Sequence, residues 1–92
     1  MGASMEFLQF DLGYQQRGAV AVVSLSGTEA NVQLLDSENL NRYKTGRTFN
    51  YYGGHYKASP ARIVIPHTGG WHVIADLGGN AGQVKASVRV IR

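Results

Sequence analysis

Apolar and polar residues alternate with a period of two through most of this 92-residue chain, and glycines interrupt the pattern repeatedly. Successive side chains of a β-strand point to opposite faces of a sheet, so this alternation predicts half-buried strands rather than helices. The clearest case is Gln83 to Ile91, where Val84, Ala86, Val88 and Val90 alternate with Lys85, Ser87 and Arg89. We expect its valines and alanine to face the core and Lys85 and Arg89 to be exposed.

Five further segments carry strand patterns: Glu6 to Leu12, Ala19 to Ser26, Asn31 to Asp36, Ala61 to Ile65 and Trp71 to Asp76. Ala19 to Ser26 is apolar on both faces, which predicts a central, buried strand. In the first of these segments Leu8, Phe10 and Leu12 alternate with Gln9 and Asp11. In the others, the residues expected to point inward are Val32, Leu34, Ile63, Ile65, Trp71 and Val73. Six or seven short strands at about ten-residue spacing predict an all-β fold, either a small antiparallel β-sandwich or a partly open barrel.

The alternation breaks between Ser37 and Gly54. Leu40 and Tyr43 are three residues apart, Asp36 or Ser37 is a candidate N-cap, and Gly46 is a candidate stop, so one or two helical turns or a plain loop are both expected over 37–44. Thr48 to Tyr52 is a candidate short strand that ends at Gly53-Gly54. The glycine-rich stretch Gly78 to Gly82 is typical of a hairpin turn.

Length and composition indicate one globular domain, with 43% apolar and 16% charged residues. We assign residues 1–4 to an expression scar and residues 5–92 to a single β domain. The chain has no cysteine, which favours the cytoplasm over an oxidising compartment. Its longest apolar run, Ala19 to Val23, is far shorter than the roughly 18 residues of a membrane span, so no membrane partner is expected.

Catalytic and metal chemistry find little support in the sequence. No serine sits in a nucleophile elbow, and Asp11, Asp36 and Asp76 are expected to end strands or cap a turn. His67 and His72 are five residues apart, His55 is remote, and no cysteine completes a metal-ligating set. We therefore expect no catalytic residues, no metal and no cofactor.

Charge is distributed unevenly, because no Asp or Glu occurs between Asn39 and Ala75. That stretch contains all three histidines and six of the nine aromatic residues. Interleaved cations and aromatic rings can bind phosphate backbones and stack on bases. The candidate binding residues are Arg42, Lys44, Arg47, Tyr51, Tyr52, His55 and Lys57. In the alternative interpretation one ring of each neighbouring pair fills the core and the cations only solvate a face.

Several motifs together resemble a family of small bacterial proteins that is known as a domain of unknown function and occurs alone or fused to TIR signalling domains. They include Phe10-Asp11-Leu12-Gly13, Tyr51-Tyr52-Gly53-Gly54, Trp71-His72-Val73, Asp76-Leu77-Gly78-Gly79 and Ala86-Ser87-Val88-Arg89-Val90. The resemblance covers almost the whole chain after Met5. It implies a compact β-rich module that can serve as the recognition or regulatory part of a signalling protein. It implies no catalytic residues.

Two functional hypotheses follow. The first is a non-catalytic module that recognises a nucleotide or another anion through Arg42 to Lys57. The second is a protein–protein or self-association module that uses an exposed sheet edge, which includes formation of a homo-oligomer.

Overall fold

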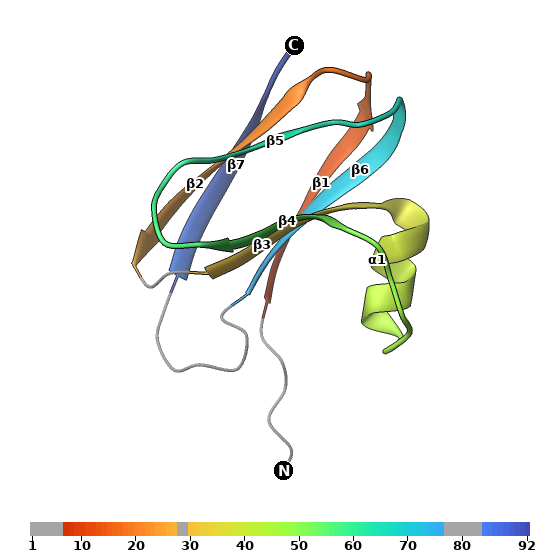
Figure 1. The fold of residues 1–92 in the computed structure, drawn as a ribbon, viewed down its shortest axis with the longest axis horizontal. Helices are drawn as coiled ribbons and strands as arrows, with labels where there is room; N and C mark the ends of the chain where they lie inside the picture. Colours follow the sequence, from red (N-terminus) through yellow and green to blue (C-terminus); the bar gives the residue numbers. More distant parts are fainter. Residues whose placement is uncertain (1–6, 28–29, 77–83) are drawn as a thin grey trace.

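Seven strands and one helix make up the part of the chain that the computed structural model describes, residues 7–27, 30–76 and 84–92 (Figure 1). In chain order they are β1 (Phe7–Gln15), β2 (Val20–Gly27), β3 (Ala30–Asp36), α1 (Ser37–Lys44), β4 (Tyr52–Tyr56), β5 (Ala61–Val64), β6 (Gly69–Asp76) and β7 (Val84–Ile91). The expected Gly78–Gly82 turn lies outside the described residues.

The strands form two separate antiparallel sheets. One has the order β1-β6-β3-β4 and the other the order β5-β2-β7. The prediction of an all-β fold is therefore confirmed. Of the two predicted architectures, the structure is a β-sandwich and not a barrel, because the two sheets pack face to face and are not joined into one closed ladder. β2, predicted to be central, does lie between β5 and β7.

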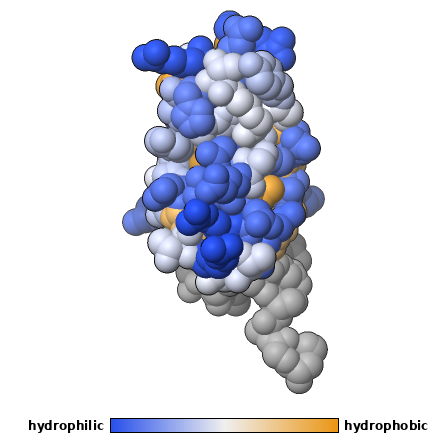
Figure 2. All heavy atoms as spheres, turned by 90° about the vertical axis from the view of Figure 1, so that its right-hand side faces the viewer, coloured by the Kyte–Doolittle hydropathy of each residue, from blue (hydrophilic) through white to orange (hydrophobic). Residues whose placement is uncertain are grey.

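α1 lies against the outer face of the four-stranded sheet, at one side of the molecule in Figure 1. Asp36 caps it, since its Oδ1 accepts a hydrogen bond from the Asn39 amide at 2.9 Å, and this decides for a helix over the loop alternative. A second apolar cluster forms beneath the helix from Leu35, Leu40, Ile74 and the half-buried Phe7, Tyr43 and Phe49. The solvent side of this face is mostly hydrophilic (Figure 2).

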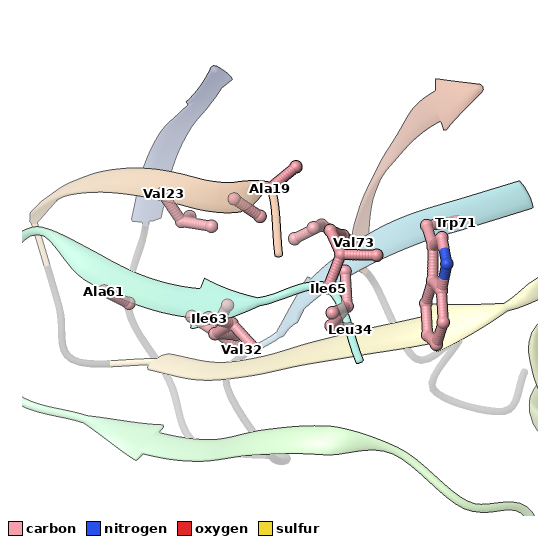
Figure 3. Packing of buried hydrophobic residues seen from close by; sticks show 10 residues of the cluster. Ala19, Val23, Val32, Leu34, Ala61, Ile63, Ile65, Trp71 and Val73 are labelled. Carbon is pink, nitrogen blue, oxygen red and sulfur yellow. The ribbon is translucent and has the colours of Figure 1, made fainter. Parts of the chain in front are cut away.

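The main core lies between the two sheets, where alternate residues of each sheet meet (Figure 3). Trp71, Val73 and Leu34 come from the four-stranded sheet and meet Val23 and Ile63 from the other. Ala86, Val88 and Val90 pack against this cluster as expected, and Lys85 and Arg89 are exposed. The side chain of Val84 lies outside the described residues.

The face of β6 opposite the main core is also covered. Ile74 is fully buried and Asp76 is only 7% exposed, because α1 covers them. The two-residue period correctly separated these side chains from Trp71 and Val73, but it does not show that a second layer lies on their side.

β4 begins where the predicted strand was expected to end. The candidate strand was Thr48 to Tyr52, whereas β4 runs from Tyr52 to Tyr56 and includes both glycines. Gly53 has φ +125° and its backbone approaches β3 so closely that an added Cβ would collide with the carbonyl oxygen of Val32. Gly53 therefore allows close pairing with β3, and the two glycines lie within the strand instead of ending it.

Replacing Gly53 by Ala should destabilise the fold by about 1–3 kcal/mol, because a side chain disfavours this backbone conformation and meets β3. Gly54→Ala is the matched control, since its Cβ would have nothing within 4 Å and Gly54 has no positive φ. Chemical denaturation of both variants measures the difference. Equal stability of the two variants would contradict this account.

Candidate functional site

A chain of hydrogen bonds links four elements around the buried Asp76. Its Oδ1 accepts from Asn31 Nδ2 on β3 at 3.1 Å, and its Oδ2 accepts from the Tyr43 hydroxyl on α1 at 3.4 Å. Asn31 Oδ1 in turn lies 3.0 Å from His55 Nδ1 on β4. Because an unpaired buried carboxylate costs several kcal/mol, these contacts give Asp76 the structural role that its position at a strand end suggested.

Three cations of the candidate site lie around the C-terminal end of α1. Arg42 forms an ion pair with Glu38 one turn earlier, with its Nη2 3.0 Å from Glu38 Oε2. Gly46 leaves the helix with φ +74°, and the Arg47 amide then donates to the Arg42 carbonyl at 2.8 Å. Lys44 and Arg47 are exposed, so the structure brings Arg42, Lys44 and Arg47 to one place.

A row of aromatic rings includes Tyr43 of α1 and continues into the segment that follows the helix. Tyr43 packs edge-to-face against Phe7 and Phe49, with ring centroids 5.4 and 5.2 Å apart. The Tyr51 ring lies 5.7 Å from Phe49 and is 45% exposed. Tyr51 therefore presents a ring that is supported on one side and open to solvent on the other.

The other candidate residues lie elsewhere. Tyr52 pairs with the inward-facing Leu34 and packs on Trp71 at 6.1 Å, so it is on the core side of β4. His55 pairs with Asn31 on the opposite face. Lys57 follows the end of β4, which points away from α1 in Figure 1. The seven residues thus divide into a group at α1 with Tyr51, and three residues spread along β4.

Ser37, His72 and Asp11, which come from three different elements, meet at the start of α1. Ser37 Oγ lies 3.0 Å from His72 Nε2, and Asp11 Oδ1 lies 3.8 Å from His72 Nδ1. This is the order of side chains in a hydrolytic triad, and sequence reasoning missed it because nothing local connects the three positions.

The geometry nevertheless fits a structural contact better than a triad. A separation of 3.8 Å is too long for a hydrogen bond, and Asp11 Oδ1 already accepts from the Gly13 amide at 2.8 Å. His72 Nδ1 is buried without a hydrogen-bond partner, so the base is not oriented as a triad requires. The Ser37–His72 contact instead fixes the first turn of α1 to β6.

No group of three or more His, Asp or Glu side chains that could hold a metal ion occurs within residues 7–27, 30–76 and 84–92. His67 packs its ring on Trp71 at 4.8 Å, and its carbonyl accepts from the indole Nε1 at 2.9 Å. None of the described helices is long and apolar enough to cross a membrane.

The comparisons with known proteins identify the family. The family model described as Domain of unknown function (DUF1883) matches residues 5–92, and the chain belongs to this family. No curated protein and no solved structure matched the chain.

Tyr43 makes the stability of the folded domain depend on pH. Burial raises the pKa of its hydroxyl above the ordinary value, and the charge of Asp76 and the hydrogen bond to it act in the same direction. The folded state therefore holds the proton more tightly than the unfolded state. The stabilisation is fully present below about pH 10, the ordinary tyrosine value, and is lost as pH rises through the folded pKa.

Tyr43→Phe should lower the free energy of unfolding at pH 7 by about 1–3 kcal/mol, because a buried carboxylate loses a donor. The difference between wild type and variant should shrink as pH rises above about 10. Denaturant titrations of both proteins across this range measure it. Tyr14→Phe, at a 70% exposed ring, is the control, and a pH-independent difference for Tyr43→Phe would contradict the assignment.

Ser37 should not react faster than other exposed serines with a fluorophosphonate, because its neighbouring histidine is not oriented by a hydrogen-bonded carboxylate. Mass spectrometry of the labelled protein locates the adduct, and Ser37→Ala is the control. Selective labelling of Ser37 that His72→Gln abolishes would show that the trio acts as a nucleophilic site.

Proposed function

We propose that this domain is a non-catalytic recognition module that binds an anionic ligand through the α1 surface, formed by Arg42, Lys44, Arg47 and Tyr51. The observation that carries the proposal is the exposed Tyr51 ring, which packs on Phe49 and follows Arg47 by four residues in the segment after α1. A nucleotide or single-stranded nucleic acid suits this arrangement, since a ring stacks on a base while cations contact phosphate.

Not all of the positive charge at α1 is available to a ligand. Arg42 is paired with Glu38, and Lys44 in the last turn offsets the negative end of the helix dipole. Arg47 lies beyond the helix. We therefore assign most of the ligand attraction to Arg47, with Lys44 second and Arg42 third.

A recognition role also fits the setting that the sequence motifs suggest. Family members fused to a signalling domain would use this module as the part that senses, and a stand-alone chain would pass the signal to a bacterial, cytoplasmic partner. Such a role needs a ligand surface and no catalytic group, which agrees with the structural use of Asp76 and His72.

A second candidate function is self-association through the free edge of β1. Two of the three other edges are protected, because β7 carries Lys85 and Arg89 and the short β5 is flanked by Pro60 and Pro66. The third, β4, has only five residues and is followed by Lys57. Within its described residues β1 has no Lys, Arg or Pro, and Leu8 and Tyr14 on it are 37% and 70% exposed. These features favour strand pairing between two copies.

Fluorescence anisotropy with fluorescein-labelled oligothymidylate at about 50 mM salt tests the anion proposal. Lys44→Gln with Arg47→Gln should weaken binding about tenfold, and binding should fall as salt rises because released counterions oppose it. Tyr51→Ala should weaken binding further through lost stacking.

Arg62→Gln with Arg89→Gln is the matched control, because it removes two cations from the other sheet. Equal weakening in both double variants would show non-specific attraction, and absence of binding would end the proposal. A mass in light scattering that rises with concentration, and that Tyr14→Lys lowers, would support self-association through β1 instead.

A further inference from the structure

The outer face of the β5-β2-β7 sheet carries cations that are not part of the α1 surface. The residues of this face, which we call the basic face, alternate with the core residues of the same strands. They are Val20, Val22, Ser24 and Ser26 on β2, Arg62 and Val64 on β5, and Lys85, Ser87, Arg89 and Ile91 on β7.

The strand register arranges these side chains in rows across the sheet, because directly paired residues of antiparallel strands share a face. Val20 pairs with Val64 on one side and Ile91 on the other, which makes an apolar row. The next row is Arg62, Val22 and Arg89, followed by Ser24 with Ser87 and then Ser26 with Lys85.

The apolar row and the cations are accessible together. Val64 and Ile91 are 57% and 46% exposed, and Arg62, Lys85 and Arg89 are exposed as well. Val22, between the two arginines, is only 1% exposed, as expected where long aliphatic stems flank a small side chain. α1 packs on β3 and β6 of the other sheet, so no described element covers the basic face.

The charged residues described on this face are all cations. The acidic residues in the described ranges, Asp11, Asp36, Glu38 and Asp76, all belong to the other sheet or to α1. None of them can offset Arg62, Lys85 and Arg89 by direct contact across the core. The described residues of this face thus include three cations and no acid, and such a face attracts a partner of opposite charge.

We infer that the basic face is a docking surface for an acidic, aliphatic segment of a protein partner. Single-stranded nucleic acid fits less well, since the face offers no aromatic ring for stacking. A bilayer fits less well too, because its acyl chains lie deeper than its charged headgroups, whereas here the apolar row and the arginines are neighbouring rows of one sheet face. Protein–protein interfaces, in contrast, have apolar residues and arginine side chains next to each other in the same surface.

The rows set the spacing that a partner must match. Neighbouring rows are about 7 Å apart along the strands, and Arg62 and Arg89 are about 10 Å apart across them. An extended segment that runs along β2 presents every second side chain to the face at the same spacing. An aliphatic residue would cover Val64 and Ile91, and the next facing residue would place a carboxylate between the arginines.

A labelled peptide of repeating Glu-Glu-Leu-Leu tests the inference, since each face of this peptide, when extended, alternates Glu and Leu at that spacing. We expect it to bind the full chain at about 50 mM salt. Arg62→Gln with Arg89→Gln should weaken binding about tenfold while retaining the aliphatic stems over Val22. Val64→Ser with Ile91→Ser should also weaken it.

The control variant Lys44→Gln with Arg47→Gln also removes two positive charges, but from the α1 surface, and it should leave peptide binding unchanged. This result would distinguish the inference from the proposal for the α1 surface. Peptides of Gln-Gln-Leu-Leu and Glu-Glu-Ala-Ala should both bind more weakly than the first. Circular dichroism confirms that each variant is folded, and Lys85→Gln is the second variant if the arginine pair proves unstable.

Three results would overturn the inference. The first is no binding of the Glu-Glu-Leu-Leu peptide, and the second is equal weakening by the two charge-matched variants. The third is that the arginine variants lose binding to oligothymidylate, or to vesicles of phosphatidylcholine and phosphatidylglycerol, but keep binding to the peptide. That result would assign the face to nucleic acid or to a membrane surface.

Discussion

Burial of β3 and β6 on both faces is the constraint on which the rest of this structure depends. Val32 and Val73 pack into the core between the sheets, while Leu35 and Ile74 on the same strands point the other way and are also fully buried. Such strands need a layer on each side. The three-stranded sheet supplies one layer and α1 the other, so a helix of eight residues completes a fold that is otherwise entirely β.

The same constraint places the groups that a ligand would meet. Covering the sheet brings Tyr43 to the buried Asp76, and it turns the end of α1 with Lys44 and Arg47 toward solvent. The three-stranded sheet has no described helix on its outer face, so Arg62 and Arg89 stay exposed there. The molecule thus has two positively charged surfaces. In the α1 surface the cations are combined with an aromatic ring, and in the basic face they are combined with aliphatic side chains.

The candidate site was predictable in composition but not in geometry. The absence of acids between Asn39 and Ala75 groups the cations and rings in sequence. It did not show that β4 starts at Tyr52, or that the Tyr52 ring packs on Trp71 in the core while the Tyr51 ring packs on Phe49. Both depend on pairing with β3, which the close backbone approach at Gly53 makes possible, and no local pattern encodes that approach.

The sequence by itself determined which side chains of each strand share a face, because that alternation is a property of the extended backbone and needs no partner. It therefore gave the all-β class and the inward positions of Ala86, Val88 and Val90. Three features depend on the tertiary structure: the choice of a sandwich over a barrel, the burial of Ile74 under α1, and the alignment of Arg62 with Arg89 on either side of β2. Those outcomes depend on strand register and layer order, which arise from contacts between residues far apart in the chain.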